Sequence, residues 1–331
     1  KLTSVVASRT DLIEDHPHIQ ALGEALSEGK VKEINLADTK FSSATLTDFV
    51  QSVRWETTAI SSVVISNNFI FGSKDKHSFD STQVHDVDGD QSGWNNLCEQ
   101  LKVSNITSFT ACDIGMGPAA LRTLATSLPA ALTSINCLAN NFGDDDLTTL
   151  LTAIEGTSVR SLCGLTEGQT VADFSGQNLG PIDMKFMATE YGFQGFIAAV
   201  ARLILDENPL TGGTLSTDFD NDITSVVNLC DTLKTSSVTE LSLAKCRLGP
   251  GSLGELAEYV RDAEAVLNSL KCANNPSMVG ELYPSGILKT PDAHAEVFKQ
   301  LTDSLKTSQV TEVDFSSCGI GPVGLGHLSD W

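Results

Sequence analysis

The chain has 331 residues, of which 41% are hydrophobic and 6% aromatic, and its formal net charge at pH 7 is −21. The hydrophobic content is typical of a folded protein and argues against a disordered chain. The negative charge argues against nucleic acid and anionic membrane surfaces as partners, because both attract clustered Lys and Arg. The longest apolar stretch, Gly195–Leu205, contains Arg202 and is too short to cross a bilayer.

One short pattern recurs from the start of the chain to its end. Its apolar residues fall at relative positions 1, 4, 6 and 11, and position 9 is often Asn, Cys or Thr. The opening residues of the copies are, in chain order, Leu2, Val31, Ile60, Ile106, Leu132, Val159, Val200, Val238, Leu267 and Val310. Two copies are nearly identical in type, VTELSLAKCRLGP at Val238–Pro250 and VTEVDFSSCGIGP at Val310–Pro322. Between Val159 and Gly180 the strand could instead begin at Gln169, and the sequence leaves that register open.

Each copy predicts a strand, a turn and a helix. The alternation at positions 4 to 6 of the pattern is typical of a short strand with one buried face. An Asn at position 9, such as Asn140, can bond backbone groups that the turn would otherwise leave unpaired. Gly-Pro, as at Gly249–Pro250, favours the start of a helix, and helical patterns follow at Ala119–Leu128 and Gly254–Leu267. The repeated order makes all strands parallel, and neighbouring units must stack to bury their apolar faces.

This pattern resembles the leucine-rich repeat family, in its ribonuclease-inhibitor-like subclass. The resemblance implies an α/β leucine-rich repeat solenoid, a horseshoe of about ten units with parallel strands on the concave face and helices on the convex face. Many consensus leucines are Val, Ile, Phe, Ala or Cys in this chain. We expect a single leucine-rich repeat domain over residues 1–331, with longer acidic insertions near 72–92 and 213–222 and an irregular unit near 159–181.

The first insertion contains the acidic sequence DVDGD. Carboxylates at alternate positions could ligate Ca²⁺, and the weak metal candidates are Asp86, Asp88 and Asp90. An EF-hand loop starting at Asp86 would need Gly and Glu where the chain has Gln91 and Leu97. We therefore favour aspartates that cap the free N–H groups of the helix that follows.

Two later segments correspond to this one, DFDND at Asp218–Asp222 and TPDAH at Thr290–His294. The second keeps a Thr-Pro-Asp sequence and loses the alternating acids, which capping tolerates and metal binding does not.

The eight cysteines contain no C-x-x-C pair and mostly occupy equivalent places in different copies, as small buried residues do. Neither end of the chain has a disulfide-rich cap, so we expect a reducing, cytoplasmic location, although the NIT sequon at Asn105 points the other way. The sequence shows no nucleophile paired with a base and no phosphate-binding fingerprint. We therefore expect no enzymatic activity and no cofactor.

The concave face is the expected recognition surface, since solenoids of this kind bind partners there. Its outward strand positions are mostly small and polar, with a few larger apolar or charged residues. The candidate partner-binding residues are Val64, Phe69, Leu138, Arg202, Ile204, Asp206, Glu207, Lys245, Arg247 and Lys271.

Three functions fit the sequence. The favoured one is a non-enzymatic scaffold that binds a protein partner on the concave face, and the charge favours a basic partner. The second is a structural module that associates with itself through open solenoid ends, because neither Leu2 nor Trp331 lies in an obvious polar cap. The third is a GTPase-activating regulator, which only the resemblance to other repeat proteins suggests.

Overall fold

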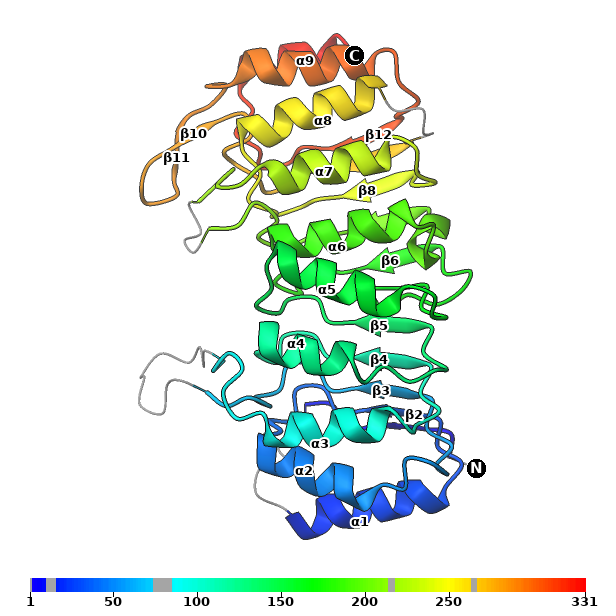
Figure 1. The fold of residues 1–331 in the computed structure, drawn as a ribbon. Coiled ribbons are helices and arrows are strands. Elements are labelled where there is room, and N and C mark those ends of the chain that lie inside the picture. The colour runs from blue at the N-terminus through cyan, green and yellow to red at the C-terminus, as the bar shows by residue number, and fades with distance from the viewer. Residues whose placement is uncertain (1, 10–15, 74–84, 214–217, 263–266) are drawn as a thin grey trace. The chain divides into compact units, whose positions relative to one another are not determined.

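The computed structural model describes residues 2–9, 16–73, 85–213, 218–262 and 267–331. It divides into two compact units, Lys1–Gly164 and Leu165–Trp331, and in each of them short parallel strands alternate with helices (Figure 1). The α/β repeat solenoid expected from the sequence is therefore present in each unit. The expectation of one domain over residues 1–331 stays a prediction.

The first unit has a five-stranded parallel sheet in the order β1-β2-β3-β4-β5. Its strands are β1 Ser4–Val6, β2 Glu33–Asn35, β3 Ser62–Val64, β4 Ser108–Thr110 and β5 Ser134–Asn136. Its helices are α1 His16–Glu28, α2 Ser43–Ser52, α3 Ser92–Leu101, α4 Pro118–Ala125 and α5 Asp144–Ile154.

The second unit has a five-stranded parallel sheet in the order β12-β9-β8-β7-β6 and a separate antiparallel hairpin, β10-β11. Its strands are β6 Val171–Asp173, β7 Arg202–Ile204, β8 Glu240–Ser242, β9 Ser269–Lys271, β10 Glu281–Leu282, β11 Leu288–Thr290 and β12 Glu312–Asp314. Its helices are α6 Pro181–Gly192, the short 3₁₀ helix η1 Phe196–Ala199, α7 Thr224–Leu233, α8 Pro250–Asp262, α9 Ala295–Leu305 and α10 Pro322–Ser329.

The register of both sheets follows the alignment of the sequence copies, because each strand begins at position 3 of its copy. The middle residue of each strand faces the helices. Ile135, Leu203 and Leu241 are buried as expected, whereas Val313 is half-buried because β12 pairs with a neighbour on one side only. None of the helices in the described part of the chain is long and apolar enough to span a bilayer.

Both registers left open by the sequence between Val159 and Gly180 are used. The copy at Val159 ends the first unit with isolated bridges to β5, from Ser161 to Ser134 and from Cys163 to Asn136. The copy at Gln169 begins the second unit as β6. The helix expected at Gly254–Leu267 starts earlier, at Pro250, because proline suits the first helical turn. Residues 263–266 of that prediction lie outside the described residues.

A buried asparagine amide follows β3, β5, β7 and β9 and joins each of these strands to the preceding repeat. Asn208, which is fully buried, shows the pattern. Its Nδ2 donates to the carbonyl of Leu205 in its own turn and to the carbonyl of Phe174 in the preceding repeat, both at 2.8 Å, and its Oδ1 accepts from Leu179 N–H at 3.0 Å. The equivalent amides are Asn68, Asn140 and Asn275.

These amides satisfy backbone groups that a three-residue strand and a tight turn cannot pair by themselves. An unpaired buried carbonyl or N–H costs about 1–3 kcal/mol. The Asn208→Ala variant leaves the Phe174 carbonyl and the Leu179 N–H without this partner. We expect it to lower the free energy of unfolding of the second unit by about 2–4 kcal/mol in urea denaturation. Asn228→Ala, on α7, is the control, and a loss below about 0.5 kcal/mol for Asn208→Ala would contradict the role given to the amide.

Candidate recognition surface

The sheet of the second unit has one face turned away from the helices, which we call the open face. It is formed by the first and third residues of each strand, and the register aligns them in two rows. The first row is Val171, Arg202, Glu240, Ser269 and Glu312. The second row is Asp173, Ile204, Ser242, Lys271 and Asp314.

Ion pairs between neighbouring strands order the long side chains of this face. Arg202 Nε lies 3.3 Å from Glu240 Oε2, and Lys271 Nζ lies 3.1 Å from Glu312 Oε1. Beyond the strand ends, Lys245 Nζ lies 2.8 Å from Glu207 Oε1. All these groups are exposed or half-buried, so each pair contributes little to stability and mainly holds the side chains in place.

The open face is hollowed where β7, β8 and β9 meet. The hollow has a volume of about 150 Å³, and Arg202, Ile204, Asp206, Glu240, Ser242 and Lys271 are among the residues that line it. Ile204 is half-buried and supplies an apolar surface that charged and hydroxyl groups surround. A small apolar centre with a polar rim is the arrangement found at protein-binding sites.

Three carboxylates of this face are held in their charged form. The Ser175 hydroxyl donates to Asp173 at 2.6 Å and lowers the pKa of that carboxyl below its ordinary value. Ser316 lowers the pKa of Asp314 in the same way, and the Lys271 ammonium lowers that of Glu312. The face therefore stays negatively charged at neutral and mildly acidic pH.

Four residues named from the sequence come together here: Arg202, Ile204, Asp206 and Lys271. Asp206 Oδ1 accepts from Ser242 Oγ and from Ala244 N–H, both at 2.7 Å, which fixes its carboxylate beside the hollow. Glu207 and Lys245 pair with each other in the turns that follow β7 and β8.

Sequence reasoning missed Glu240, Ser242, Ser269 and Glu312 on this surface. They occupy the same repeat positions as Arg202 and Ile204, so reading one position across all copies would have found them. Val171, 47% exposed, was missed because the register around Gln169 was open.

Leu138, which the sequence placed on the concave face, has a side chain that is only 1% exposed. Residues 161–164 return across β5, where the Cys163 carbonyl accepts from Asn136 Nδ2 and Gly164 N–H donates to the Ile135 carbonyl, and both outward residues of β5 become buried.

Arg247, which the sequence placed among the partner-binding residues, is half-buried. Its backbone φ is 59°, and its Nη1 donates to the Gly213 carbonyl at 2.6 Å, at the base of the second insertion. In the first unit, Val64 is half-buried on β3, and the Phe69 ring packs against His85 with the ring centres 5.0 Å apart.

The threonines at position 2 of the copies also bond within the sheet. Thr107, Thr133, Thr239 and Thr311 each donate a hydroxyl hydrogen to a carbonyl at the entry of the preceding strand. They satisfy backbone carbonyls at the entry of the neighbouring strands.

Two aspartates of the first insertion bond to helix N-termini, as the capping interpretation predicts, but they serve two different helices. Asp90 Oδ1 accepts from Ser92 N–H at 2.9 Å, at the start of α3. The Asp88 carboxylate instead accepts from the N–H groups of Gly117, Ala119 and Ala120, which start α4 in the next repeat. Asp86 takes part in neither of these two sets of bonds.

The second unit repeats this arrangement. Asp222 bonds the start of α7 at Thr224 N–H. Asp220 bonds the start of α8, and Asp292 bonds the start of α10, with the same sequence separations as Asp88 has from α4. The capping aspartates Asp88, Asp220 and Asp292 all have a φ between 52° and 60°, a backbone conformation that Asp and Asn tolerate best. Among the described residues, no group of three His, Cys, Asp or Glu could hold a metal ion.

All eight cysteine side chains are buried. Burial raises the pKa of Cys98 and of Cys230 to about 12 and that of Cys318 to about 11. Thiols in this state are poor nucleophiles, so they act in packing.

The strand order and register described above define the class of the protein as an α/β repeat protein. No protein-family profile matches the sequence, and a search of curated proteins finds no match. Among solved structures, the leucine-rich repeat-containing protein LegL7 from Legionella pneumophila is similar over 99% of this chain and 89% of its own, with 16% identity and a TM-score of 0.44. A chain of the Rad7 and Elc1 complex in yeast is similar over 95% of this chain and 69% of its own, with 12% identity and a TM-score of 0.42. Both likenesses are distant, and the fold assignment rests on the topology of each unit.

Because the capping aspartates bond helix N–H groups through their charged form, we expect the stability that they contribute to be lost in acid. Asp292 provides the test. Burial alone would raise the pKa of Asp292, but the N–H groups of Gly321, Val323 and Gly324 outweigh it and hold the pKa below its ordinary value. A lowered pKa in the folded state stabilises the fold above the unfolded value of about 4, and this stabilisation is lost as the pH falls through the folded value.

We expect Asp292→Asn to lower the free energy of unfolding by about 1 kcal/mol at pH 7, and the difference from the natural chain to shrink below about pH 4. Asn tolerates the positive φ, so the change isolates the carboxylate. Chemical denaturation at several pH values measures the effect, with Asp330→Asn, directly after α10, as the control. A difference that persists unchanged at acid pH would contradict the role of the charge.

Proposed function

We propose that this protein is a non-enzymatic scaffold of leucine-rich-repeat type, in its ribonuclease-inhibitor-like form, that binds a protein partner on the open face of the second unit. This is the concave face of the horseshoe expected from the sequence. The observation that carries the proposal is the hollow at β7–β9, where Ile204 lies among side chains that Asp206 and the ion pairs hold in place. Pre-ordered side chains lower the entropic cost of binding.

The charge of the face favours a basic partner. Arg202, Lys271 and Lys245 are matched by Glu240, Glu312 and Glu207 in cross-strand pairs. The remaining carboxylates of this surface are Asp173, Asp206 and Asp314, which bond to serine hydroxyls and backbone N–H groups. Their charge is therefore available to Lys or Arg of a partner, and the net charge of −21 speeds the approach of such a partner. The buried cysteines are compatible with the reducing, cytoplasmic location that we propose for it.

Random peptides displayed on phage test this proposal without a known partner. We expect peptides selected on the natural chain to be rich in Lys and Arg around an apolar residue. Ile204→Arg removes the apolar centre and adds a repelling charge, so it should weaken the selected peptides by at least about tenfold, with the melting temperature unchanged. Val103→Arg, at a 47% exposed position after α3, makes the same chemical change elsewhere. Equal binding to both variants would reject the open face as the site.

A second candidate function, self-association, is supported by a separate observation on α10. This helix exposes two large apolar side chains, Val323 at 54% and Leu325 at 59%. Exposed apolar side chains on a repeat helix favour contact with a second copy of the same chain.

Light scattering tests self-association by mass action. The measured mass should rise with protein concentration, and Leu325→Glu should return it to that of one chain. A mass that is independent of concentration in the natural chain would reject this candidate and would leave the scaffold proposal intact.

A further inference from the structure

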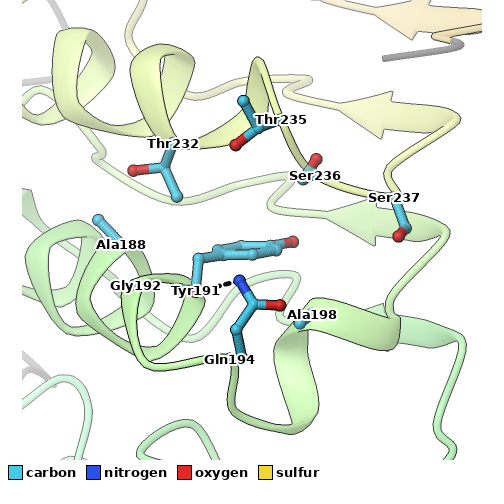
Figure 2. A pocket seen from close by; sticks show the side chains of 9 residues that line it. All are labelled: Ala188, Tyr191, Gly192, Gln194, Ala198, Thr232, Thr235, Ser236 and Ser237. Carbon is cyan, nitrogen blue, oxygen red and sulfur yellow. Dashed lines mark hydrogen bonds between the residues drawn. The ribbon is translucent and has the colours of Figure 1, made fainter. Parts of the chain in front are cut away.

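A second cavity of the second unit lies away from the open face, where two helices end. Its volume is about 380 Å³, within the size range of small-molecule sites. Figure 2 shows the Tyr191 ring and Gln194 on one side of the cavity and Thr232, Thr235, Ser236 and Ser237 on the other. The short helix η1 contributes Ala198, and α6 contributes Ala188 and Gly192.

Every side chain that lines this cavity is uncharged, and hydrogen bonds within the protein already use several of the donors. Thr232 Oγ1 donates to the Asn228 carbonyl at 2.7 Å, and Ser236 Oγ donates to the Leu233 carbonyl at 2.9 Å. Gln194 Nε2 donates to the Tyr191 carbonyl at 3.1 Å, which leaves its Oε1 for the cavity (Figure 2). Because their hydroxyl hydrogens are directed into the protein, Thr232 and Ser236 offer acceptor lone pairs to a ligand, of which Ser236 already uses one for Val238 N–H at 3.2 Å, and Gln194 Oε1 is a third acceptor.

The backbone adds partial negative charge. Helix α6 ends at Gly192 and α7 ends at Leu233, so both helices direct their C-terminal ends toward the cavity. A helix C-terminus carries about half a negative charge and favours cations. Lys234, which follows α7, pairs its ammonium with Asp231 at 2.8 Å and does not line the cavity.

The wall formed by η1 is held by a buried contact. Glu190, fully buried in α6, accepts from Ile197 N–H at 2.9 Å and so fixes η1 against α6. This contact positions Ala198 at the edge of the cavity, opposite Thr232 and Thr235. The cavity therefore depends on the connection between α6 and η1. Among the described residues, no other repeat has a 3₁₀ helix at this place.

We propose that this cavity binds a small organic cation with N–H donors, such as an aliphatic mono- or diamine. Ammonium hydrogens match the acceptors of Thr232, Ser236 and Gln194, and the positive charge suits the two helix C-termini and the aromatic face of Tyr191. The negative charge of the whole chain raises the local concentration of cations near the site. A neutral polyol of the same length would find the same acceptors but would gain nothing from the field.

A matched pair of probes separates charge from shape, 1,4-diaminobutane and its isostere 1,4-butanediol. Isothermal titration calorimetry of the full chain at about 0.15 M salt, where diffuse surface attraction is screened, measures both. We expect one diamine per chain with a Kd between about 10 µM and 1 mM, and at least about tenfold weaker binding of the diol.

Three variants locate the site. Ala198→Leu fills the cavity from the half-buried side of η1, whereas Ala199→Leu makes the same change at its exposed, non-lining neighbour. Thr235→Val keeps the side-chain shape and removes a hydroxyl that lines the cavity, and it provides a test should Ala198→Leu unfold the unit. We expect Ala198→Leu to abolish diamine binding, Thr235→Val to weaken it severalfold, and Ala199→Leu to leave it unchanged.

Several results would overturn the proposal. Absence of diamine binding to the natural chain would do so, and so would equal affinity for the diol. Diamine binding that persists equally in Ala198→Leu and Thr235→Val would show attraction to the acidic surface only.

Discussion

The buried asparagine amides are the contacts on which each unit depends. The hydrogen bonds between strands satisfy the backbone of only three residues per repeat. The turn that follows leaves the sheet while it is still surrounded by apolar side chains, so its backbone groups need other partners. One amide there bonds its own turn and the turn of the preceding repeat, as Asn140 does with the Ala111 carbonyl and the N–H groups of Ile114 and Met116. Without this link, several buried backbone groups per repeat would stay unpaired, each at a cost comparable to that of a lost hydrogen bond.

The capping aspartates work in the opposite direction along the chain. Asn208 joins its repeat to the preceding one, whereas Asp220, later in the same repeat, joins it to the next by bonding the start of α8. The helices that receive these carboxylates begin with Gly-Pro, and their first N–H groups have no intrahelical partner. A repeat with both residues is thus bonded to both neighbours, which makes neighbouring repeats cooperative. The insertions supply these links, and their aspartates need no metal ion to account for them.

A sheet ordered in this way is a rigid platform for recognition. Within each row of first or third strand residues, neighbours stand about 5 Å apart, the usual spacing of parallel strands, so ion pairs form between neighbouring strands without large entropic cost. The surface that results has an apolar centre at Ile204 and a surplus of carboxylates. The cavity at the ends of α6 and α7 has a different chemistry, because neutral acceptors and helix dipoles line it. The two sites of this unit would therefore attract positive charge for different reasons, one through formal charges and the other through oriented dipoles.

The sequence by itself determined the strand positions, the inward residues and the asparagine turns, because a repeat fixes which side chains face the core within every copy. It also indicated that the acidic clusters cap helices. Only the tertiary structure decided that Asp88 caps the helix of the next repeat, that residues 161–164 bond to β5, and that Arg247 bonds Gly213 at the base of an insertion. These contacts join different copies or involve irregular segments, whose paths depend on stacking and on loop geometry. Periodicity describes the direction of a side chain within one copy, but it says nothing about what the next copy or an insertion places against it.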